Sequence, residues 1–171
     1  MPDSTQNAPV LFAYDGSEYA KAAIRQAGQQ LQKGRPAIVL TVWQPAGAMA
    51  FAAAPGLPPV GFDENPEKRA RRVAGEGATL ARSSGFRAEP IAERGDIVWQ
   101  RIVDSAEEHD ASIVVMGTHG RTGISLALVG SVAAATARHS DRPVLIAHSH
   151  PPSDPETFPQ TRRSGDGIDA G

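Results

Sequence analysis

The chain has 171 residues, 40% of them hydrophobic, and no obvious linker in the middle, so we expect one globular domain with a sizeable core. Its formal net charge of −2 provides no basic field for DNA or RNA, which argues against a nucleic-acid-binding protein. The lack of cysteine excludes disulfides, thiolate zinc sites and cysteine nucleophiles. No signal peptide or membrane-spanning run is readable, so we expect a cytoplasmic protein.

The first part of the chain predicts a strand, a helix and a second strand. Residues 10–14 form the first apolar run, and the turn sequence Asp15-Gly16-Ser17 after it is able to cap a helix. Apolar residues at helical spacing predict that helix over 18–33, with Gly34 as its stop. Residues 37–43 are almost continuously apolar or β-branched, which favours a strand of a parallel sheet covered on both faces.

A segment rich in proline, glycine and alanine, residues 44–66, interrupts this alternation and predicts a loop without regular structure. We expect a helix over 67–84 with charge on two sides, because four basic residues cluster in its first turns. Residues 88–92 then predict a short strand, which we place at a sheet edge because Pro90 lacks an N–H group.

Asp96 is the expected cap of the next helix, which runs to about residue 109. Four apolar residues at helical spacing predict its inward stripe. These residues are Ile97, Ile102, Val103 and Ala106.

Two further strands with a helix between them complete the expected fold. Residues 113–116 predict a strand, 132–138 a helix, and 143–148 the fifth strand. The segment after Ser149 is poor in apolar residues, so we expect a mobile tail over 149–171. We expect one domain over 9–148, preceded by a flexible N-terminus over 1–8.

Five strands alternating with helices predict a doubly wound α/β fold, with a five-stranded parallel sheet and helices on both faces. Such sheets bind ligands outside the carboxyl ends of their strands, at the point where strand order reverses. Asp15 follows the first predicted strand and Gly117 the fourth. These residues would lie together if the two strands were neighbours, which the sequence pattern by itself does not decide.

The segment from Gly117 to Ser131 is the most informative motif, with the spacing Gly117-x2-Gly120-x9-Gly130-Ser131. Its glycines lie in the connection between a predicted strand and the helix that follows it, and they permit positive φ or close backbone approach. Consecutive amides and the positive end of the following helix would hold phosphate oxygens. Ser131 would either donate its hydroxyl to a phosphate or serve as an ordinary N-cap, and both roles stay open.

Together with Asp15-Gly16-Ser17 and Arg142-Pro143-Val144, this spacing resembles the universal stress protein family, specifically its ATP-binding branch, over residues 9–148. The resemblance implies an adenine nucleotide alpha hydrolase-like fold with strand order 3-2-1-4-5. It also implies an adenine nucleotide as ligand, ATP with Mg²⁺ or Mn²⁺ on its phosphates, and a homodimer paired through residues 143–148. Neither the downstream protein partner nor the metal ligands follow from it.

The resemblance assigns thirteen positions to the nucleotide site. It places Asp15 beside the ribose and phosphates, and the main chain of Val42 at the adenine edge. Tyr14 and Ala133 depart from the family, which often has serine or threonine at the first of these positions and a hydroxyl-bearing residue at the second. The full set is Ala13, Tyr14, Asp15, Val42, Met116, Gly117, His119, Gly120, Arg121, Gly130, Ser131, Val132 and Ala133.

Three classes of function remain open. The first is a regulatory protein that holds ATP in a stress response and needs no catalytic base. The second is a slow ATPase or an adenylate- or phosphoryl-transferring enzyme. Only Asp15, His119 and Arg121 are available for catalysis near the glycine motif, and we assign none of them as catalytic. The third is a dimeric interaction module without nucleotide. The loop 44–66 would be a lid over the adenine pocket or a variable surface insertion.

Overall fold

The computed structural model describes residues 8–45, 65–118 and 129–148, and predictions on other residues lie outside this part of the chain. Strands and helices alternate along it. In chain order they are β1 (Val10–Ala13), α2 (Glu18–Gln30), β2 (Pro36–Trp43), α4 (Pro66–Ser83), β3 (Arg87–Arg94), α5 (Val98–Glu108), β4 (Ile113–Gly117), α6 (Ser131–His139) and β5 (Val144–Ala147).

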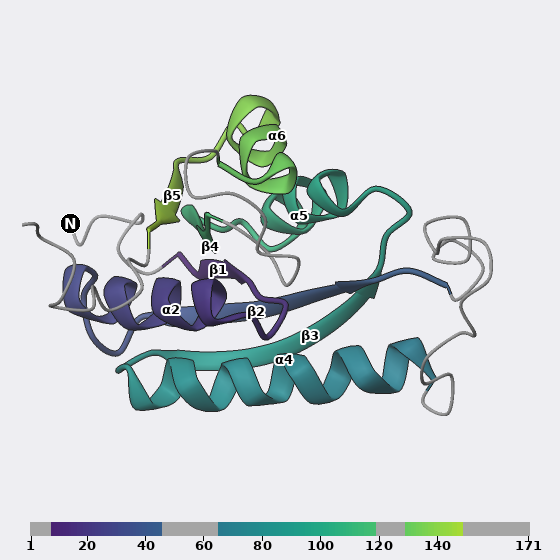
Figure 1. Cartoon of the computed structure of the whole chain (residues 1–171). Helices are drawn as coiled ribbons and strands as arrows, with labels where there is room; N and C mark the ends of the chain where they lie inside the picture. Colours follow the sequence, from purple (N-terminus) through teal and green to yellow (C-terminus); the bar gives the residue numbers. More distant parts are fainter. Residues whose placement is uncertain (1–7, 46–64, 119–128, 149–171) are drawn as a thin grey trace, which may run out of the picture.

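The five strands form one parallel sheet in the order β3-β2-β1-β4-β5, which confirms the expected fold (Figure 1). β1 lies at its centre, where Phe12 pairs with Val39 of β2 on one side and with Val115 of β4 on the other. The strand order therefore reverses between β1 and β4. Their carboxyl ends are the place where a doubly wound fold binds its ligand.

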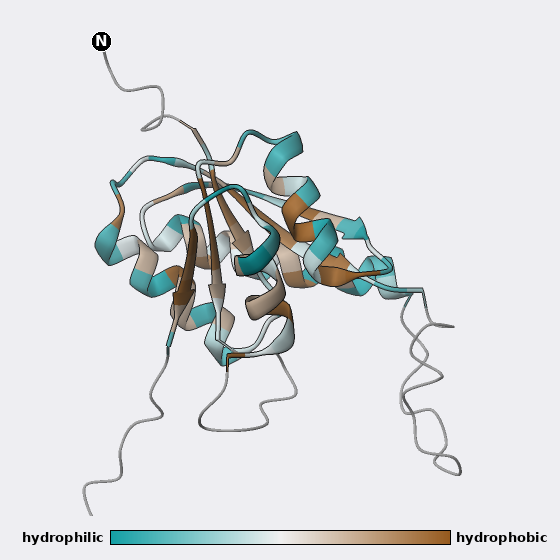
Figure 2. Cartoon of the chain, turned by 90° about the horizontal axis from the view of Figure 1, so that it is seen from above, coloured by the Kyte–Doolittle hydropathy of each residue, from teal (hydrophilic) through white to brown (hydrophobic). Residues whose placement is uncertain are grey.

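Helices cover both faces of the sheet, with α2 and α4 on one face and α5 and α6 on the other (Figure 1). Alternate residues of β1 serve the two layers. Phe12 packs under α2 and α4, where its ring meets Phe86 edge to face at 5.1 Å, whereas Leu11 packs under α5 and α6. In Figure 2 the apolar strands lie between helices whose outer surfaces are hydrophilic.

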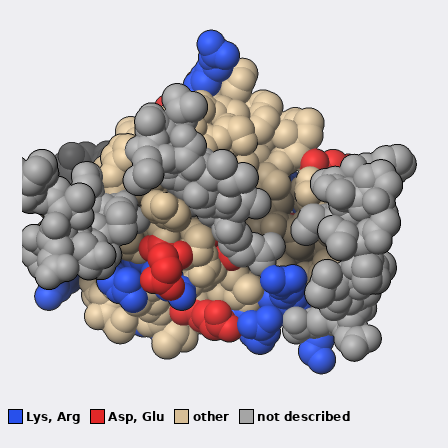
Figure 3. All heavy atoms as spheres, viewed as in Figure 1, with Lys and Arg blue, Asp and Glu red and all other residues tan. Residues whose placement is uncertain are grey.

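Helix α4 differs from the prediction because one of its faces is buried. Its charged residues lie outside, and its ion pairs include Arg71 to Glu67 at 2.6 Å and Arg72 to Glu76 at 2.9 Å. Basic and acidic side chains alternate over this side of the molecule (Figure 3). The buried stripe consists of Ala70, Val73, Ala74, Gly77, Ala78 and Ala81, whose small side chains let the helix lie close to the sheet.

Strand β3 is an edge strand, as predicted from Pro90, but it is longer than expected. All eight of its residues pair with β2, from Pro36 with Arg87 to Trp43 with Arg94. The predicted strand ended at residue 92, and the two residues that follow it, Glu93 and Arg94, are charged. Pairing with the continuous strand β2 extends β3 where its own composition does not.

The start of α5 corrects two predictions. Its N-cap is Ile97, which makes no side-chain capping bond, and Ile97 is 50% exposed, so it does not belong to the inward stripe. Asp96 lies 3.6 Å from Arg94 in an exposed ion pair. The Gly95 N–H donates to the carbonyl of Trp43 at 3.0 Å, and this tie to β2 keeps the connection extended for one residue more than expected.

Other element ends shift by one to three residues. α2 ends at Gln30 rather than at residue 33, because Leu31 is extended and packs against the core beneath α2 and α4. Gly34, the predicted stop, has φ +77° in the turn that follows. α4 begins at Pro66, inside the predicted loop 44–66, with Asn65 as its N-cap.

Candidate functional site

The turn after β1 builds one wall of the candidate site. The Ser17 N–H donates to Oδ1 of Asp15 at 3.0 Å, and the Ser17 hydroxyl accepts from the Ala20 N–H at 3.1 Å. Gly16 between them has φ +84°, a left-handed conformation that favours glycine. Asp15 therefore organises the turn, and the helix cap predicted for this turn sequence is provided by Ser17.

Gly117 ends β4 against the first turn of α2. A Cβ atom added there would lie 2.6 Å from the carbonyl carbon of Tyr19 and 2.9 Å from the Ala20 nitrogen. Such distances are shorter than real Cβ contacts, so this glycine is required for packing. Gly117 lies at the carboxyl end of β4, next to the helix that follows β1, as expected for neighbouring strands. The close backbone approach predicted for this glycine is made to α2.

Helix α6 begins where β4 ends. The Gly130 N–H donates to the Thr118 carbonyl at 2.7 Å, so the chain returns after the segment 119–128 to the point from which it left. At the other end of α6, His139 stacks on Trp99 of α5 with ring centroids 4.5 Å apart. The helix is thus held at both ends, with its N-terminus at the switch point.

Gly130 and Ser131 have different backbone roles from those that the motif suggested. Gly130 is the N-cap, with φ −56° and ψ 152°, so it does not need a glycine-only conformation. Ser131 is the first helical residue and is exposed, so its interpretation as an N-cap is wrong. Because glycine has no side-chain oxygen, Gly130 caps none of the first-turn amides that follow it.

Five of the thirteen predicted residues belong to the core cluster beneath α5 and α6. Met116 and Ala133 are buried, at 5% and 3% exposure, and the other three are partly buried. Their side chains form apolar packing, which leaves main-chain groups for any polar contact with a ligand. These five are Ala13, Val42, Met116, Val132 and Ala133.

Val42 lies near the carboxyl end of β2, where neighbouring segments fix its position. A Cβ atom added to Gly95 would lie 2.9 Å from Cγ1 of Val42 and 2.7 Å from Cβ of Arg101. The connection from β3 to α5 therefore packs tightly against the strand end that was assigned to the adenine edge. Gly95 is therefore required for packing at this end of β2.

Tyr14 is directed toward the opposite face, into the core cluster beneath α2 and α4, with 4% of the residue exposed. Its N–H donates to the Leu40 carbonyl at 2.8 Å, and its carbonyl accepts from the Thr41 hydroxyl at 2.8 Å. Burial raises the pKa of its phenol, and Lys21 opposes this effect. Thr41 was missed because a threonine inside an apolar strand gives no local sign of such a contact.

The remaining predicted residues, His119, Gly120 and Arg121, lie outside the described part of the chain. Within residues 8–45, 65–118 and 129–148, no group of three or more His, Asp or Glu side chains is arranged to hold a metal ion. No helix in these same residues has the length and hydropathy needed to cross a membrane.

The sheet order and the helix N-terminus at the switch point define a doubly wound α/β protein with a candidate anion site. Over residues 7–148 the sequence matches the model of the universal stress protein family. The chain belongs to this family.

Relatives and solved structures agree with this assignment. The chain is 37% identical over 62 residues to universal stress protein MJ0577 of Methanocaldococcus jannaschii, covering 36% of this chain and 38% of that protein. It is 28% identical over 148 residues to a universal stress protein of Mycolicibacterium smegmatis, covering 81% of this chain and 45% of the relative. In both cases the match spans less than half of the relative's length.

Among solved structures, that of MJ0577 superimposes with a TM-score of 0.66 at 23% identity, covering 85% of this chain and 99% of the other. A universal stress protein in complex with cAMP gives 0.55 at 26% identity, covering 83% and 97%. The Archaeoglobus fulgidus universal stress protein in complex with dAMP gives 0.56 at 23% identity, covering 81% and 96%. These likenesses show the fold.

Proposed function

We propose that the chain is a nucleotide-dependent regulatory protein of the stress response that binds an adenine nucleotide, with ATP as the leading ligand, at the carboxyl edge between β1 and β4. The observation that carries this proposal is the start of α6. A glycine N-cap is bonded to the end of β4 and caps none of the next three amides with a side chain. A helix N-terminus in this arrangement favours a phosphate group.

The proposed contacts divide between the two walls of the site. The first-turn amides of α6 and the Ser131 hydroxyl would hold phosphate oxygens, and Asp15 would bond a ribose hydroxyl. The main chain of Val42 would meet the adenine edge. Mg²⁺ or Mn²⁺ would be bound through the phosphate oxygens. The complexes of family members with cAMP and dAMP support an adenine nucleotide as the class of ligand.

The experiment starts from the purified protein, which is denatured so that any released small molecule is identified by mass. ATP affinity is then measured by calorimetry for the native chain and for Gly130→Val. The backbone angles of Gly130 are accessible to valine, so this variant tests crowding of the phosphates, with circular dichroism as the control for folding. Absence of nucleotide, together with equally weak binding in both proteins, would contradict the proposal.

Turnover of labelled ATP tests the enzymatic alternative. Hydrolysis or adenylate transfer that is lost in Asp15→Ala, while ATP binding persists, would favour a slow enzyme over a regulatory protein. A protein that binds no nucleotide and remains dimeric would favour the interaction module.

We further propose a homodimer paired through residues 143–148, with residues 9–148 as the functional unit. β5 pairs with β4 and with no other described strand, and three of its four apolar residues are only partly buried. An open apolar edge of this kind favours pairing with a second chain. Light scattering of the native protein and of Leu145→Lys tests this pairing, and a monomer in both cases would exclude it. The cytoplasmic location stays a prediction.

A further inference from the structure

Gly77 lies inside α4, where glycine is unfavourable for a helix, and it is fully packed. A Cβ atom added there would lie 2.7 Å from Cδ1 of Tyr14 and 2.8 Å from Cγ1 of Val39. Gly75, two residues earlier in the same helix, has nothing within 4 Å of an added Cβ atom. Gly77 therefore makes room for the ring of Tyr14, whereas Gly75 has no comparable packing role.

The ring of Tyr14 is connected directly to the turn that carries Asp15. Both main-chain polar groups of Tyr14 are bonded to β2, through the Leu40 carbonyl and the Thr41 hydroxyl, each at 2.8 Å. The next residue is Asp15, whose carboxylate accepts from the Ser17 N–H. The position of the buried ring thus helps to set where the Asp15 turn begins.

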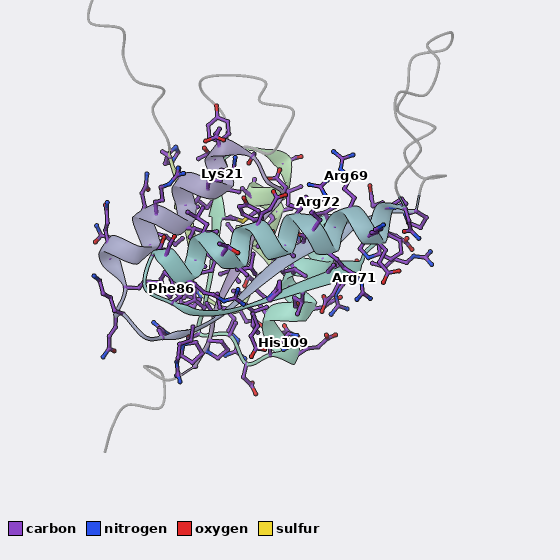
Figure 4. All side chains as sticks on the ribbon, turned by 90° about the horizontal axis from the view of Figure 1, so that it is seen from below. Lys21, Arg69, Arg71, Arg72, Phe86 and His109 are labelled. Carbon is purple, nitrogen blue, oxygen red and sulfur yellow. The ribbon has the colours of Figure 1, made fainter. Side chains whose placement is uncertain are left out.

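Helix α4 also runs close to the same turn at Val73, one helical turn before Gly77. A Cβ atom on Gly16 would lie 3.5 Å from Cγ1 of Val73, an ordinary van der Waals distance. α2 and α4 lie side by side on this face of the sheet, as Figures 1 and 4 show. A displacement of α4 would therefore be felt at both Tyr14 and Gly16.

From these contacts we infer that Gly77 is a positioning residue for the Asp15 turn and so for the affinity of the nucleotide site, although it lies on α4 and touches no proposed ligand. This inference rests on the proposed function. A methyl group at position 77 displaces the Tyr14 ring or the helix, because the slot has no free space. The turn that presents Asp15 then shifts with it.

The test compares Gly77→Ala with Gly75→Ala, the same change in the same helix without a close neighbour. ATP affinity is measured by calorimetry, and exchange of the backbone amides of residues 14–17 is measured without nucleotide. We expect Gly77→Ala to weaken ATP binding roughly tenfold and to speed this exchange, while Gly75→Ala changes neither. Equal behaviour of the two variants in both measurements would overturn the inference.

Double variants separate positioning through Tyr14 from a general disturbance of α4. In the Tyr14→Ala background, Gly77→Ala should add little further loss of affinity, because the ring that it displaces is gone. In the Val39→Ala background, the loss should persist. An unchanged loss beside Tyr14→Ala, or a loss removed by Val39→Ala, would overturn the inference.

The same variants also decide two further outcomes. If Gly77→Ala does not fold, Tyr14→Ala is compared with Tyr14→Ala/Gly77→Ala, where equal affinity supports the inference and a further loss contradicts it. If the native protein binds no ATP, the proposed function fails, and amide exchange in the same variants still decides whether Gly77 positions the turn.

Discussion

Two helices start at the candidate site, and their first turns are built differently. α2 begins with a hydroxyl cap from Ser17, a turn closed by Asp15, and an acidic residue, Glu18, in its first turn. α6 begins with glycine and has no acidic residue in its first turn. The N-terminus of α2 is therefore neutralised by its own side chains. That of α6 keeps its positive end for a bound anion, which explains why the phosphate site is proposed there.

The glycines beside these two helix starts differ in a similar way, because one is needed for packing and the other is not. Gly117 is needed because α2 packs directly against it, whereas Gly130 has ordinary backbone angles and a partly exposed position. A side chain at position 117 would disturb the fold. At position 130 it would disturb mainly the proposed ligand.

The largest expected effect comes from Gly117→Ala. The added methyl group would overlap the Tyr19 and Ala20 backbone, which cannot rotate away, so we expect a loss of about 3 kcal/mol in the free energy of unfolding. Urea denaturation measures this loss. Gly130→Ala is the control, with a loss below about 1 kcal/mol at the N-cap. Equal losses would remove the distinction between the two glycines.

Next in size is the effect of Ser131→Ala on ligand binding. Loss of a hydroxyl that donates to a phosphate should weaken ATP binding roughly tenfold, about 1.4 kcal/mol, while stability stays within about 0.5 kcal/mol. Calorimetry and urea denaturation give the two quantities. Ser83→Ala, at the far end of α4, is the control and should leave ATP affinity unchanged. A loss of stability without a loss of ATP affinity in Ser131→Ala would argue against a phosphate site at the start of α6.

Ser17→Ala should show the opposite pattern at α2. Removal of the hydroxyl that accepts from the Ala20 N–H should lower the free energy of unfolding by about 1 kcal/mol, as for other lost N-caps. The midpoint of urea denaturation, compared directly with that of Ser131→Ala, measures this difference. If the two serine variants were equally destabilised, the starts of α2 and α6 would not differ as proposed.

The smallest expected effect concerns pH and the turn before α2. Burial raises the pKa of the Tyr14 phenol in the folded protein above its ordinary value near 10. The neutral phenol is therefore favoured by folding. This contribution to stability is fully present below the unfolded pKa and is lost as the pH rises through the folded pKa.

Ultraviolet titration of the native protein and of Tyr14→Phe measures this shift, because the chain has only two tyrosines. The difference between the two curves should give a transition above pH 10. A transition at or below the ordinary value would show that the phenol is not held in the core, and would weaken the role given to Tyr14 at the turn.

Several parts of the fold followed from the sequence because they rest on local chemistry. The alternation of apolar runs and turns predicted all five strands and the four helices between them. Pro90 predicted the edge position of β3, and the Asp15-Gly16-Ser17 turn predicted a capped helix. Resemblance to the family added the strand order. That order determines whether Asp15 and Gly117 lie at neighbouring strand ends.

Local patterns failed where contacts with distant segments decided the outcome. Asp96 looked like a helix cap, but the hydrogen bond between Gly95 and Trp43 extends that connection. Ser131 looked like an N-cap, but Gly130 is bonded to Thr118 and takes that position.

By itself, the sequence determined the alternation of elements, because hydrophobic periodicity acts over short distances along the chain. Its glycine spacing carried the resemblance to the family, and that resemblance assigned the residues proposed for a nucleotide site. Only the tertiary structure decided which way Tyr14 faces, and that Gly77 of α4 makes room for it. The same packing assigned Gly117 to the fold, because close approach between backbones depends on segments that meet only after folding. Gly130, with its ordinary backbone angles, stays available for the proposed ligand.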